Sequence, residues 1–330
     1  MNKFVRIRDI AIYHPDRVLD NEYYIKHFEK QKKDVRHLLE DVYGRKKRYV
    51  IDPDSEENSL TMQIEASKKV LQKCSLTGAD MDMVIVATQI PEYVVPTCAI
   101  MLHRAIKGKK DAFCYDVNAN CVSMLFAIES TYRYFESNPY INKVLIVGGE
   151  YSTQVHSPLN ELGYGVFGDA ACAVVLERTE DGQAGLLDSE FFVNDFFFDR
   201  MIFPHCGMSN IYRAAKEDIL STMETVDCGL DDVIERIKKV LDRNSLKCSD
   251  ISTYCFSQFV YRNVETIRAG LEIPEEKSLY VGDEYGYTGV SSPFLVFNKA
   301  IEEGKVQRGD YVLFWTIGAG VQHLIMLIRY

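Results

Sequence analysis

A cysteine at the start of an apolar helical pattern is the residue of this chain best suited to chemistry. Cys121 follows the polar run 118–120 and precedes "VSMLFAIESTYRYFES", whose apolar residues recur at helical spacing. A thiol at a helix N-terminus feels the helix dipole and free N–H groups, which lower its pKa and favour the reactive thiolate. The same N–H groups stabilise the oxyanion that forms when a thioester is attacked. Cys121 is therefore a candidate nucleophile, and an ordinary buried thiol is the alternative.

Stretches typical of strands and helices alternate around this cysteine. Short runs rich in Val, Ile and Ala predict buried strands, and longer runs with apolar residues at helical spacing predict helices. The predicted strands span 81–89, 112–118, 143–150 and 170–178, and the predicted helices span 97–106 and 121–137. Strands that alternate with helices indicate an α/β layered fold.

The second half of the chain repeats this plan weakly. Three pairs of segments match in the same order along the chain: 75–89 with 245–258, 120–129 with 289–298, and 143–150 with 310–320. This matching order indicates an internal duplication. We therefore expect two similar α/β halves, an N-terminal half of residues 1–185 that carries the candidate nucleophile and a C-terminal half of residues 186–330.

Two further stretches have more than one interpretation. The segment "GYGVFG" (163–168) matches a dinucleotide-binding pattern, but it leads into a predicted strand rather than a helix. We therefore interpret it as a turn, and a nucleotide-dependent oxidoreductase is the alternative hypothesis that rests on it. The Phe-rich stretch 189–210 predicts either a buried strand with a packed loop or an apolar wall or lid for a ligand.

The composition limits the class of protein. Of the 330 residues 47% are hydrophobic, and the net charge of −10 argues against a nucleic-acid partner. Nine cysteines without a CxxC pair indicate reduced thiols, and no Cys or His spacing indicates a metal site. The first residues lack a signal-peptide pattern, and the apolar runs are too short to span a membrane. We expect a cytoplasmic enzyme with no membrane contact and no cofactor.

The ordered motifs resemble those of β-ketoacyl-ACP synthase III, a family of thiolase-fold condensing enzymes. Five stretches carry the resemblance, in the expected order and over nearly the whole chain: 43–50, 87–99, 116–128, 164–177 and 286–320. The segment "DVNANCVSMLFAI" resembles the family's nucleophile segment. The resemblance implies a thiolase-like α-β-α-β-α sandwich of two duplicated halves, with Cys121 as the residue that is acylated by a thioester.

This chain departs from the family at two positions. In the family, a His and an Asn help to decarboxylate a malonyl thioester, and the carbanion attacks the acyl-Cys. The His position corresponds to Ser257 in "SQFVYR", and the Asn position corresponds to Tyr287 in "GYTG". A Ser hydroxyl cannot take up a proton as imidazole does at neutral pH. The alternative is that a nearby histidine, His205 or His156, fills the role.

The resemblance also implies how the acyl donor is bound. The family usually presents a Trp and an Arg to the adenine of coenzyme A, and the matching positions lie near Leu38 and Val42. Arg262 matches a position that contacts the acidic acyl carrier protein, and a solvated surface Arg is its alternative interpretation. The basic cluster 44–48 serves the same partner or is a solvated loop. The backbone N–H of Ala319, with that of Cys121, is expected to bind the oxyanion.

These observations predict an acyltransferase that resembles β-ketoacyl-ACP synthase III. Cys121 takes an acyl group from a carrier-protein or coenzyme A thioester and passes it to an acceptor, by carbon–carbon condensation or by ester or amide formation. The setting is fatty acid, polyketide or related specialised metabolism. We expect a homodimer or a heterodimer with a related chain. The alternative from another class is a non-catalytic or weakly active partner subunit of a heteromeric ketosynthase.

Overall fold

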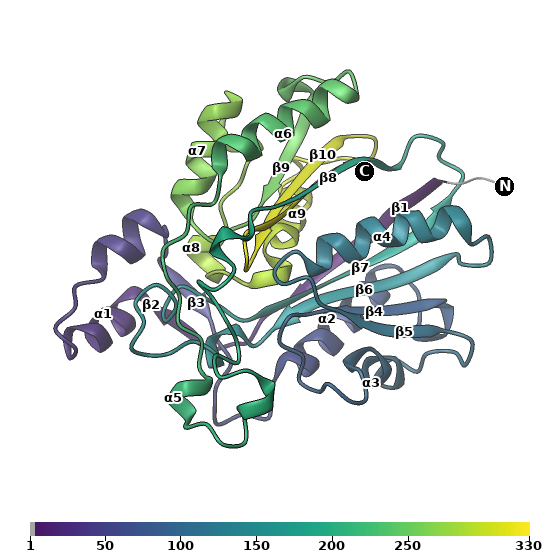
Figure 1. The fold of residues 1–330 in the computed structure, drawn as a ribbon. Coiled ribbons are helices and arrows are strands. Elements are labelled where there is room, and N and C mark those ends of the chain that lie inside the picture. Colours follow the sequence, from purple (N-terminus) through teal and green to yellow (C-terminus); the bar gives the residue numbers. More distant parts are fainter. Residues whose placement is uncertain (1–3) are drawn as a thin grey trace.

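Two β-sheets form the frame of the protein in the computed structural model, which describes residues 4–330 (Figure 1). The first sheet contains, in spatial order, β1 (Phe4–Tyr13), β7 (Ala170–Thr179), β6 (Lys143–Glu150), β4 (Met83–Ala87) and β5 (Phe113–Val117). The second contains β8 (Gly185–Val193), β11 (Gln322–Arg329), β10 (Tyr311–Gly318) and β9 (Ile251–Phe256). In each sheet, parallel pairs (β6–β4–β5 and β10–β9) adjoin antiparallel ones.

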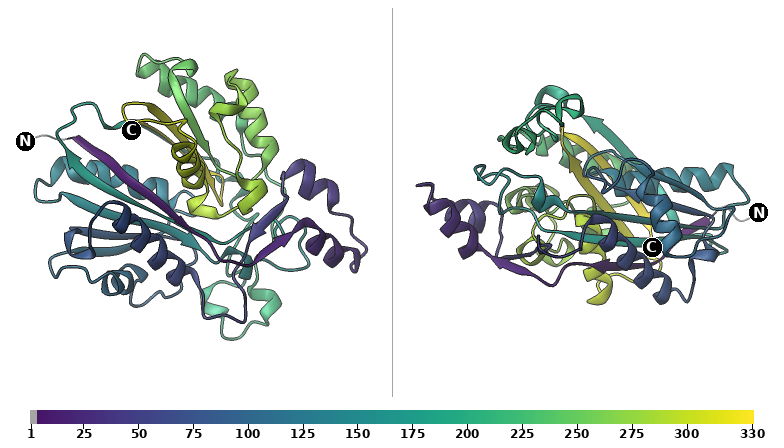
Figure 2. Two further views of the ribbon diagram at one scale, coloured as in Figure 1. Left: turned by 180° about the vertical axis from the view of Figure 1, so that it is seen from behind. Right: turned by 90° about the horizontal axis from the view of Figure 1, so that it is seen from below.

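Helices lie outside and between these sheets. The principal ones are α2 (Ser59–Lys73), α3 (Cys98–Ala105), α4 (Ser123–Ser137), α6 (Leu230–Arg243), α7 (Tyr261–Leu271) and α9 (Ser292–Glu302). α2 and α3 pack on the outer face of the first sheet, and α6 and α7 pack on the outer face of the second. α4 and α9 lie between the two sheets (Figure 2). The order of layers is therefore α-β-α-β-α, the thiolase-like sandwich.

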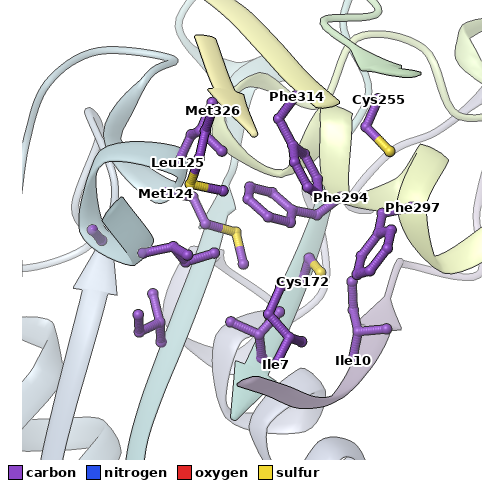
Figure 3. Packing of buried hydrophobic residues seen from close by; sticks show 14 of the residues in the cluster. Ile7, Ile10, Met124, Leu125, Cys172, Cys255, Phe294, Phe297, Phe314 and Met326 are labelled. Atoms are coloured by element: carbon purple, nitrogen blue, oxygen red, sulfur yellow. The ribbon is translucent and has the colours of Figure 1, made fainter. Parts of the chain in front are cut away.

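The layer between the sheets is a continuous apolar core. Figure 3 shows Met124 of α4, Phe294 and Phe297 of α9, and Phe314 of β10 meeting there. The rings of Phe294 and Phe314 stack with centroids 5.3 Å apart, and Phe297 meets Phe314 edge to face at 5.3 Å. Truncating one of these rings to Ala costs about 3–5 kcal/mol in comparable cores. This core fixes α4, and hence the segment before it, against both sheets.

The two halves share local details as well as layers. Ser75 and Ser245 both have positive φ values, 54° and 57°, at the end of a helix. A short 3-10 turn follows in each half, where the Asp80 carboxylate accepts a hydrogen bond of 2.8 Å from Thr77 N and Asp250 accepts one of 2.7 Å from Lys247 N. Each turn leads directly into a buried strand. The same positive-φ serine and the same Asp-capped turn occur at equivalent positions of the two halves, which supports the internal duplication.

Smaller elements gather at the end of the sandwich where the candidate site lies. They are β2 (Val18–Asp20), α1 (Asn21–Glu29), the π-helical turn η1 (Leu38–Val42), β3 (Lys47–Tyr49), α5 (Lys216–Ile219) and α8 (Gly282–Tyr285). The boundary between halves at residue 185 stays a prediction. β7, in the first sheet, ends at Thr179, and β8, in the second, begins at Gly185.

Candidate active site

Cys121 lies in a tight turn between β5 and α4. The helix begins at Ser123, so the thiol stands just ahead of the first helical turn rather than within it. Asn120 adopts a left-handed conformation with φ of 55°, which Asn tolerates better than most residues. The Ser123 hydroxyl accepts a 2.7 Å hydrogen bond from Ala119 N and donates a 2.6 Å one to Asn120 O. These bonds fix the backbone on which the thiol is mounted.

The turn between β10 and β11 packs against this backbone. Asn120 Nδ2 donates a 3.1 Å hydrogen bond to Ala319 O, and the Thr316 hydroxyl donates to Cys121 O at 3.4 Å. A Cβ atom on Gly318 would lie 3.0 Å from Asn120 Cβ, so a side chain there would crowd the nucleophile segment. The fold thus brings Ala319 and Cys121 together at one cavity, although 198 positions separate them in the sequence.

Tyr287 and Ser257 are buried next to the thiol. The Tyr287 hydroxyl interacts with Cys121, and Ser257 lies close to that hydroxyl. Two backbone bonds fix Tyr287: its N–H donates to Val166 O at 3.1 Å, and its carbonyl accepts from Gly168 N at 3.0 Å. Ser257 Oγ is buried without a hydrogen-bond partner of good geometry. The positions expected for the family's His and Asn therefore converge on Cys121.

Gln89 and Glu150, which the sequence pattern did not single out, complete the surroundings of the thiol. Gln89 Nε2 lies 3.4 Å from Cys121 Sγ and 3.0 Å from Glu150 Oε2, and Gln89 N donates to Glu150 Oε1 at 2.8 Å. The position of Glu150 in the sequence could have indicated its role. Glu150 ends the apolar strand β6, and ligands of open α/β sheets bind at the carboxyl ends of strands.

The electrostatics of the site differ from the expectation for a helix N-terminus. Burial, followed by the nearby Glu150 carboxylate, raises the pKa of Cys121 to about 12, while Tyr287 and Gln89 oppose the shift by hydrogen bonding. The prediction of a lowered thiol pKa is therefore wrong for the resting site. Among residues 4–330 no cationic side chain acts on the thiol to offset the loss of water, so burial outweighs the helix dipole. Burial also raises the pKa of Glu150 to about 7.

A cavity of about 270 Å³ leads to the thiol. Most of its walls are apolar, and they come from segments far apart in the sequence: Leu38, Val42, Tyr43, Leu162, Phe167, Phe197, Met201, Met223, Val226, Phe259, Val260, Ile317 and Val321. Arg200 and Glu224, which form an ion pair, are the charged lining residues. A second thiol, Cys228, also lines the cavity. Such a cavity suits an acyl or pantetheine-like chain.

The Phe-rich stretch 189–210 is not a buried strand with a packed loop, because none of its residues is buried, but part of it forms a wall of the cavity. It begins as β8 and continues as a loop in which Phe196 is exposed, while Phe197 lines the cavity. The segment 163–168 is a turn that leads into β7, so it is not the start of a helix and does not form a dinucleotide loop. These outcomes remove the oxidoreductase hypothesis.

Neither candidate histidine occupies the position of the missing imidazole. His205 lies in an exposed loop and does not line the cavity. His156 is buried behind Phe167, on which it stacks with centroids 3.9 Å apart. The Phe167 ring in turn lies 5.3 Å from that of Tyr287. The histidine alternative is therefore not supported, because an aromatic ring stands between His156 and the tyrosine.

The basic cluster 44–48 is divided between surface and interior, because the side chains of Lys46 and Lys47 are exposed. Arg45 and Arg48 are buried, with exposed fractions of 1% and 0%. Arg45 donates hydrogen bonds to Val166 O at 2.9 Å and to Phe259 O at 2.7 Å. The two arginines therefore support the walls of the site and are not available to a partner. Local sequence could not predict this role, because the carbonyl groups that Arg45 binds lie far away along the chain.

Arg262 lies at the surface, at the start of α7. Its Nε donates to Asp41 O at 3.3 Å, and it stands between Val260 and Asn263 on one side of the cavity. Within residues 4–330, no cluster of three or more metal-binding side chains is present. The helices in that part of the chain are too short or too polar to cross a membrane.

The chain matches known proteins along its length. A family described as 3-oxoacyl-[acyl-carrier-protein (ACP)] synthase III matches residues 115–194, and the C-terminal domain of the same family matches residues 241–330. A β-ketoacyl-[acyl-carrier-protein] synthase III of Koribacter versatilis is 28% identical, over 98% of this chain and 97% of that protein.

Solved structures share the fold over almost every residue. The 3-oxoacyl-[acyl-carrier-protein] synthase III of Aquifex aeolicus superposes with a TM-score of 0.86 and 24% identity, covering 99% of this chain and 100% of that one. The priming β-ketosynthase of the R1128 polyketide pathway superposes with a TM-score of 0.87 and 19% identity, covering 99% and 96%. On the matched sequence segments and this shared fold, the chain belongs to the β-ketoacyl-[acyl-carrier-protein] synthase III family of condensing enzymes.

Proposed function

We propose that this protein is an acyltransferase in which Cys121 accepts an acyl group from a thioester and passes it to an acceptor. The observation that carries the proposal is the position of the thiol, which lies at an apolar cavity of about 270 Å³ beside Ala319 and Tyr287. The backbone N–H groups of Cys121 and Ala319 are the proposed donors to the oxyanion. Such donors stabilise the tetrahedral intermediate of acyl transfer.

The nature of the acceptor follows from what surrounds the thiol. The rings of Phe167, Phe259 and Tyr287 lie 5.0–6.2 Å from one another, and no imidazole lies among them. Decarboxylation of a malonyl thioester needs donors aimed at the developing enolate oxygen, and the Ser257 and Tyr287 hydroxyls supply weaker ones than His and Asn. We therefore infer an acceptor that arrives already nucleophilic, such as an alcohol, an amine or a preformed carbanion. Malonyl condensation at a low rate is the alternative within the same family.

The proposed acyl donor is a carrier-protein thioester. Leu38 and Val42 line the cavity, and neither can stack on adenine or pair with it as Trp and Arg do. Arg262, exposed beside the cavity, offers a cation to an acidic carrier. Coenzyme A thioesters are the second choice, because the pantetheine arm is common to both donors.

A second copy of the chain is the proposed partner of the first sheet's edge. β5 is an edge strand, and Phe113 on it is 61% exposed. α3 packs against β5 and carries the exposed Ile100, while Val94 and Val95 are exposed in the preceding loop. Exposed apolar residues at a sheet edge are typical of an interface. A heterodimer with a related chain would use the same face.

One observation favours a weakly active partner subunit as the second candidate. The thiol is buried and its pKa is raised to about 12, in a site with no imidazole to take the proton. A scaffold subunit has no need of a thiol at this position, however, and the intact cavity leads to it. We therefore place this candidate second.

Intact-protein mass spectrometry tests the proposal. The protein is incubated with acyl-carrier-protein and acyl-coenzyme A thioesters, with and without a malonyl carrier, as wild type and as Cys121→Ala. Cys228→Ala is the matched control, because Cys228 is the other thiol in the cavity. An adduct lost only in Cys121→Ala supports the proposal. Discharge by malonyl carrier as a ketoacyl product would instead indicate a condensing enzyme, and no adduct from any donor would favour the partner subunit.

A further inference from the structure

A buried carboxylate and an amide form a hydrogen-bonded unit with the Cys121 thiol. Gln89 Nε2 contacts both groups, Cys121 Sγ at 3.4 Å and Glu150 Oε2 at 3.0 Å. Glu150 is completely buried, and Gln89 is half-buried. The three residues come from the turn before α4, the segment after β4 and the end of β6. Three adjacent parts of the first half thus converge on the reacting atom.

Glu150 is held by amide groups rather than by a cation. Its carboxylate accepts hydrogen bonds from Gln89 N and Gln89 Nε2, and from the backbone N–H of Val290. Gly289 makes room for it, because a Cβ atom there would collide with Glu150 Oε2. A buried carboxylate usually has a cationic partner, since its transfer from water is costly. A buried carboxylate without a cationic partner, next to the thiol, points to a task there.

The carboxylate also fixes which way the Gln89 amide faces. An ionised carboxylate only accepts hydrogen bonds, so the NH₂ group of Gln89 must be the part that faces Glu150. The same NH₂ group has a second hydrogen, and Cys121 Sγ is its nearest partner. Gln89 Oε1 lies further from the sulfur, at 3.8 Å. Glu150 thereby orients a donor at the atom on which negative charge develops.

We propose that Gln89 and Glu150 activate the Cys121 thiol, with Gln89 donating to the Cys121 sulfur and Glu150 accepting the thiol proton during acylation. This inference rests on the proposed function. The S–H bond breaks as sulfur bonds to the thioester carbon, and the proton passes to the Glu150 carboxylate. The carrier's C–S bond then breaks, and the departing thiolate takes the proton from Glu150. The carrier leaves as a free thiol, and the carboxylate is restored.

Charge conservation within the buried site favours this proton acceptor. Ionising Cys121 while Glu150 is also ionised would place two negative charges in a region without a cation, which low dielectric penalises. Moving the proton from thiol to carboxylate leaves one negative charge throughout. The amide nitrogen of Gln89 is a neighbour of both groups, so the thiol and the carboxylate lie on either side of one side chain.

The groups that face Glu150 define its pH dependence. They are Cys121 and Tyr287 in the site and Asp169, a buried carboxylate before β7. Burial raises the pKa of Glu150 to about 7, with Asp169 adding to the rise. The carboxylate is a proton acceptor only when it is ionised. The reactivity of Cys121 should therefore increase as the pH rises through about 7.

The test is the alkylation of Cys121 by iodoacetamide from pH 5.5 to 9, followed at its own peptide by mass spectrometry. Glu150→Gln removes the proton acceptor, and Gln89→Leu removes the donor at a half-buried position. Glu129→Gln and Gln63→Leu are the controls, because both residues are buried but bond elsewhere, to Ser189 and to Gly149 O. At pH 7.5 we expect alkylation about tenfold slower in both site variants. The inflection near pH 7 should vanish in Glu150→Gln.

Faster alkylation of Cys121 in Glu150→Gln than in wild type would overturn the inference. If Glu150 acts only through its charge, its removal lowers the pKa of Cys121 and speeds alkylation. If Glu150→Gln does not fold, Gln89→Leu decides, since an unchanged rate contradicts the proposed donor. Alkylation needs no acyl donor, so it distinguishes a failure of the inference from a failure of the proposed acyltransferase function. A pH response lost in Glu150→Gln without any acyl adduct refutes the acyltransferase alone, and acylation of Glu150→Gln at the wild-type rate refutes the inference alone.

Discussion

The side chain of Arg45 donates a 2.7 Å hydrogen bond to the carbonyl oxygen of Phe259, 214 residues further along the chain. The same guanidinium also bonds to the carbonyls of Tyr43, Val166 and Gln258. One buried cation therefore joins the β3 segment of the first half to the loop after β9, which carries Ser257. The geometry of the site depends on this link between the halves.

Replacing Arg45 should loosen the site from a distance. In Arg45→Met four buried carbonyl groups lose their donor, and we expect a loss of about 3 kcal/mol in the free energy of unfolding. Chemical denaturation measures this loss, and acylation of Cys121 should fall with it. Lys46→Met is the matched control, because its side chain is 79% exposed and pairs only with Asp283 at the surface. If Lys46→Met lost as much free energy of unfolding as Arg45→Met, the proposed role of Arg45 would be wrong.

His156 should make the protein sensitive to acid. Burial lowers the pKa of its imidazole to about 3, and neither ring nitrogen has a partner. The folded state holds it neutral, whereas the unfolded chain binds a proton below about pH 6.5, so stability falls as the pH drops through this range. At pH 5 this costs about 2 kcal/mol, and His156→Phe should remove it.

Thermal unfolding at pH 5 and pH 7.5 checks this difference. Wild type should lose more stability than His156→Phe between the two values. His205→Phe, at an exposed position, should behave as wild type does. If both substitutions changed the pH response equally, burial of His156 would not be its source.

Restoring the family's residues should restore decarboxylation. In Ser257→His with Tyr287→Asn, an imidazole and an amide replace two hydroxyls beside Cys121, and both can donate to an enolate oxygen. We expect release of carbon dioxide from a malonyl carrier to rise about tenfold or more over wild type. Each single substitution should give less. Equal rates for wild type and the double variant would mean that these two positions do not limit decarboxylation.

The exposed edge of the first sheet should mediate association. Phe113→Lys places a charge on β5, and we expect the protein to pass from dimer to monomer in light scattering coupled to gel filtration. Tyr212→Lys is the control, since Tyr212 is 98% exposed and lies in the loop before α5 rather than on β5 or α3. A wild-type monomer, or a Phe113→Lys dimer, would contradict the proposed interface.

Local pattern was enough for the strands and helices that were predicted around Cys121. The strand predicted at 143–150 is β6 with the same ends, and the helix predicted at 121–137 begins two residues later, at Ser123. Alternation and apolar runs report burial directly, so these elements are visible in sequence. The duplication was readable for the same reason, because matching turns and strands recur in order.

The sequence predicted only part of the site. Cys121, Ser257 and Tyr287 were found by matching ordered motifs, and the fold brings them together. The contacts of Gln89 and Glu150 join segments 61 residues apart, and no local pattern marks such a pair. The raised pKa of Cys121 has the same origin, since it depends on burial by distant segments rather than on the helix that follows.

The most direct test of the central claim is the mass of the intact protein after incubation with an acyl-carrier-protein thioester. We expect one added acyl group in wild type and in Cys228→Ala, and none in Cys121→Ala. Digestion should place the adduct on the peptide that contains Cys121. An adduct of equal yield in Cys121→Ala, or a wild-type protein that no thioester acylates, would contradict this claim.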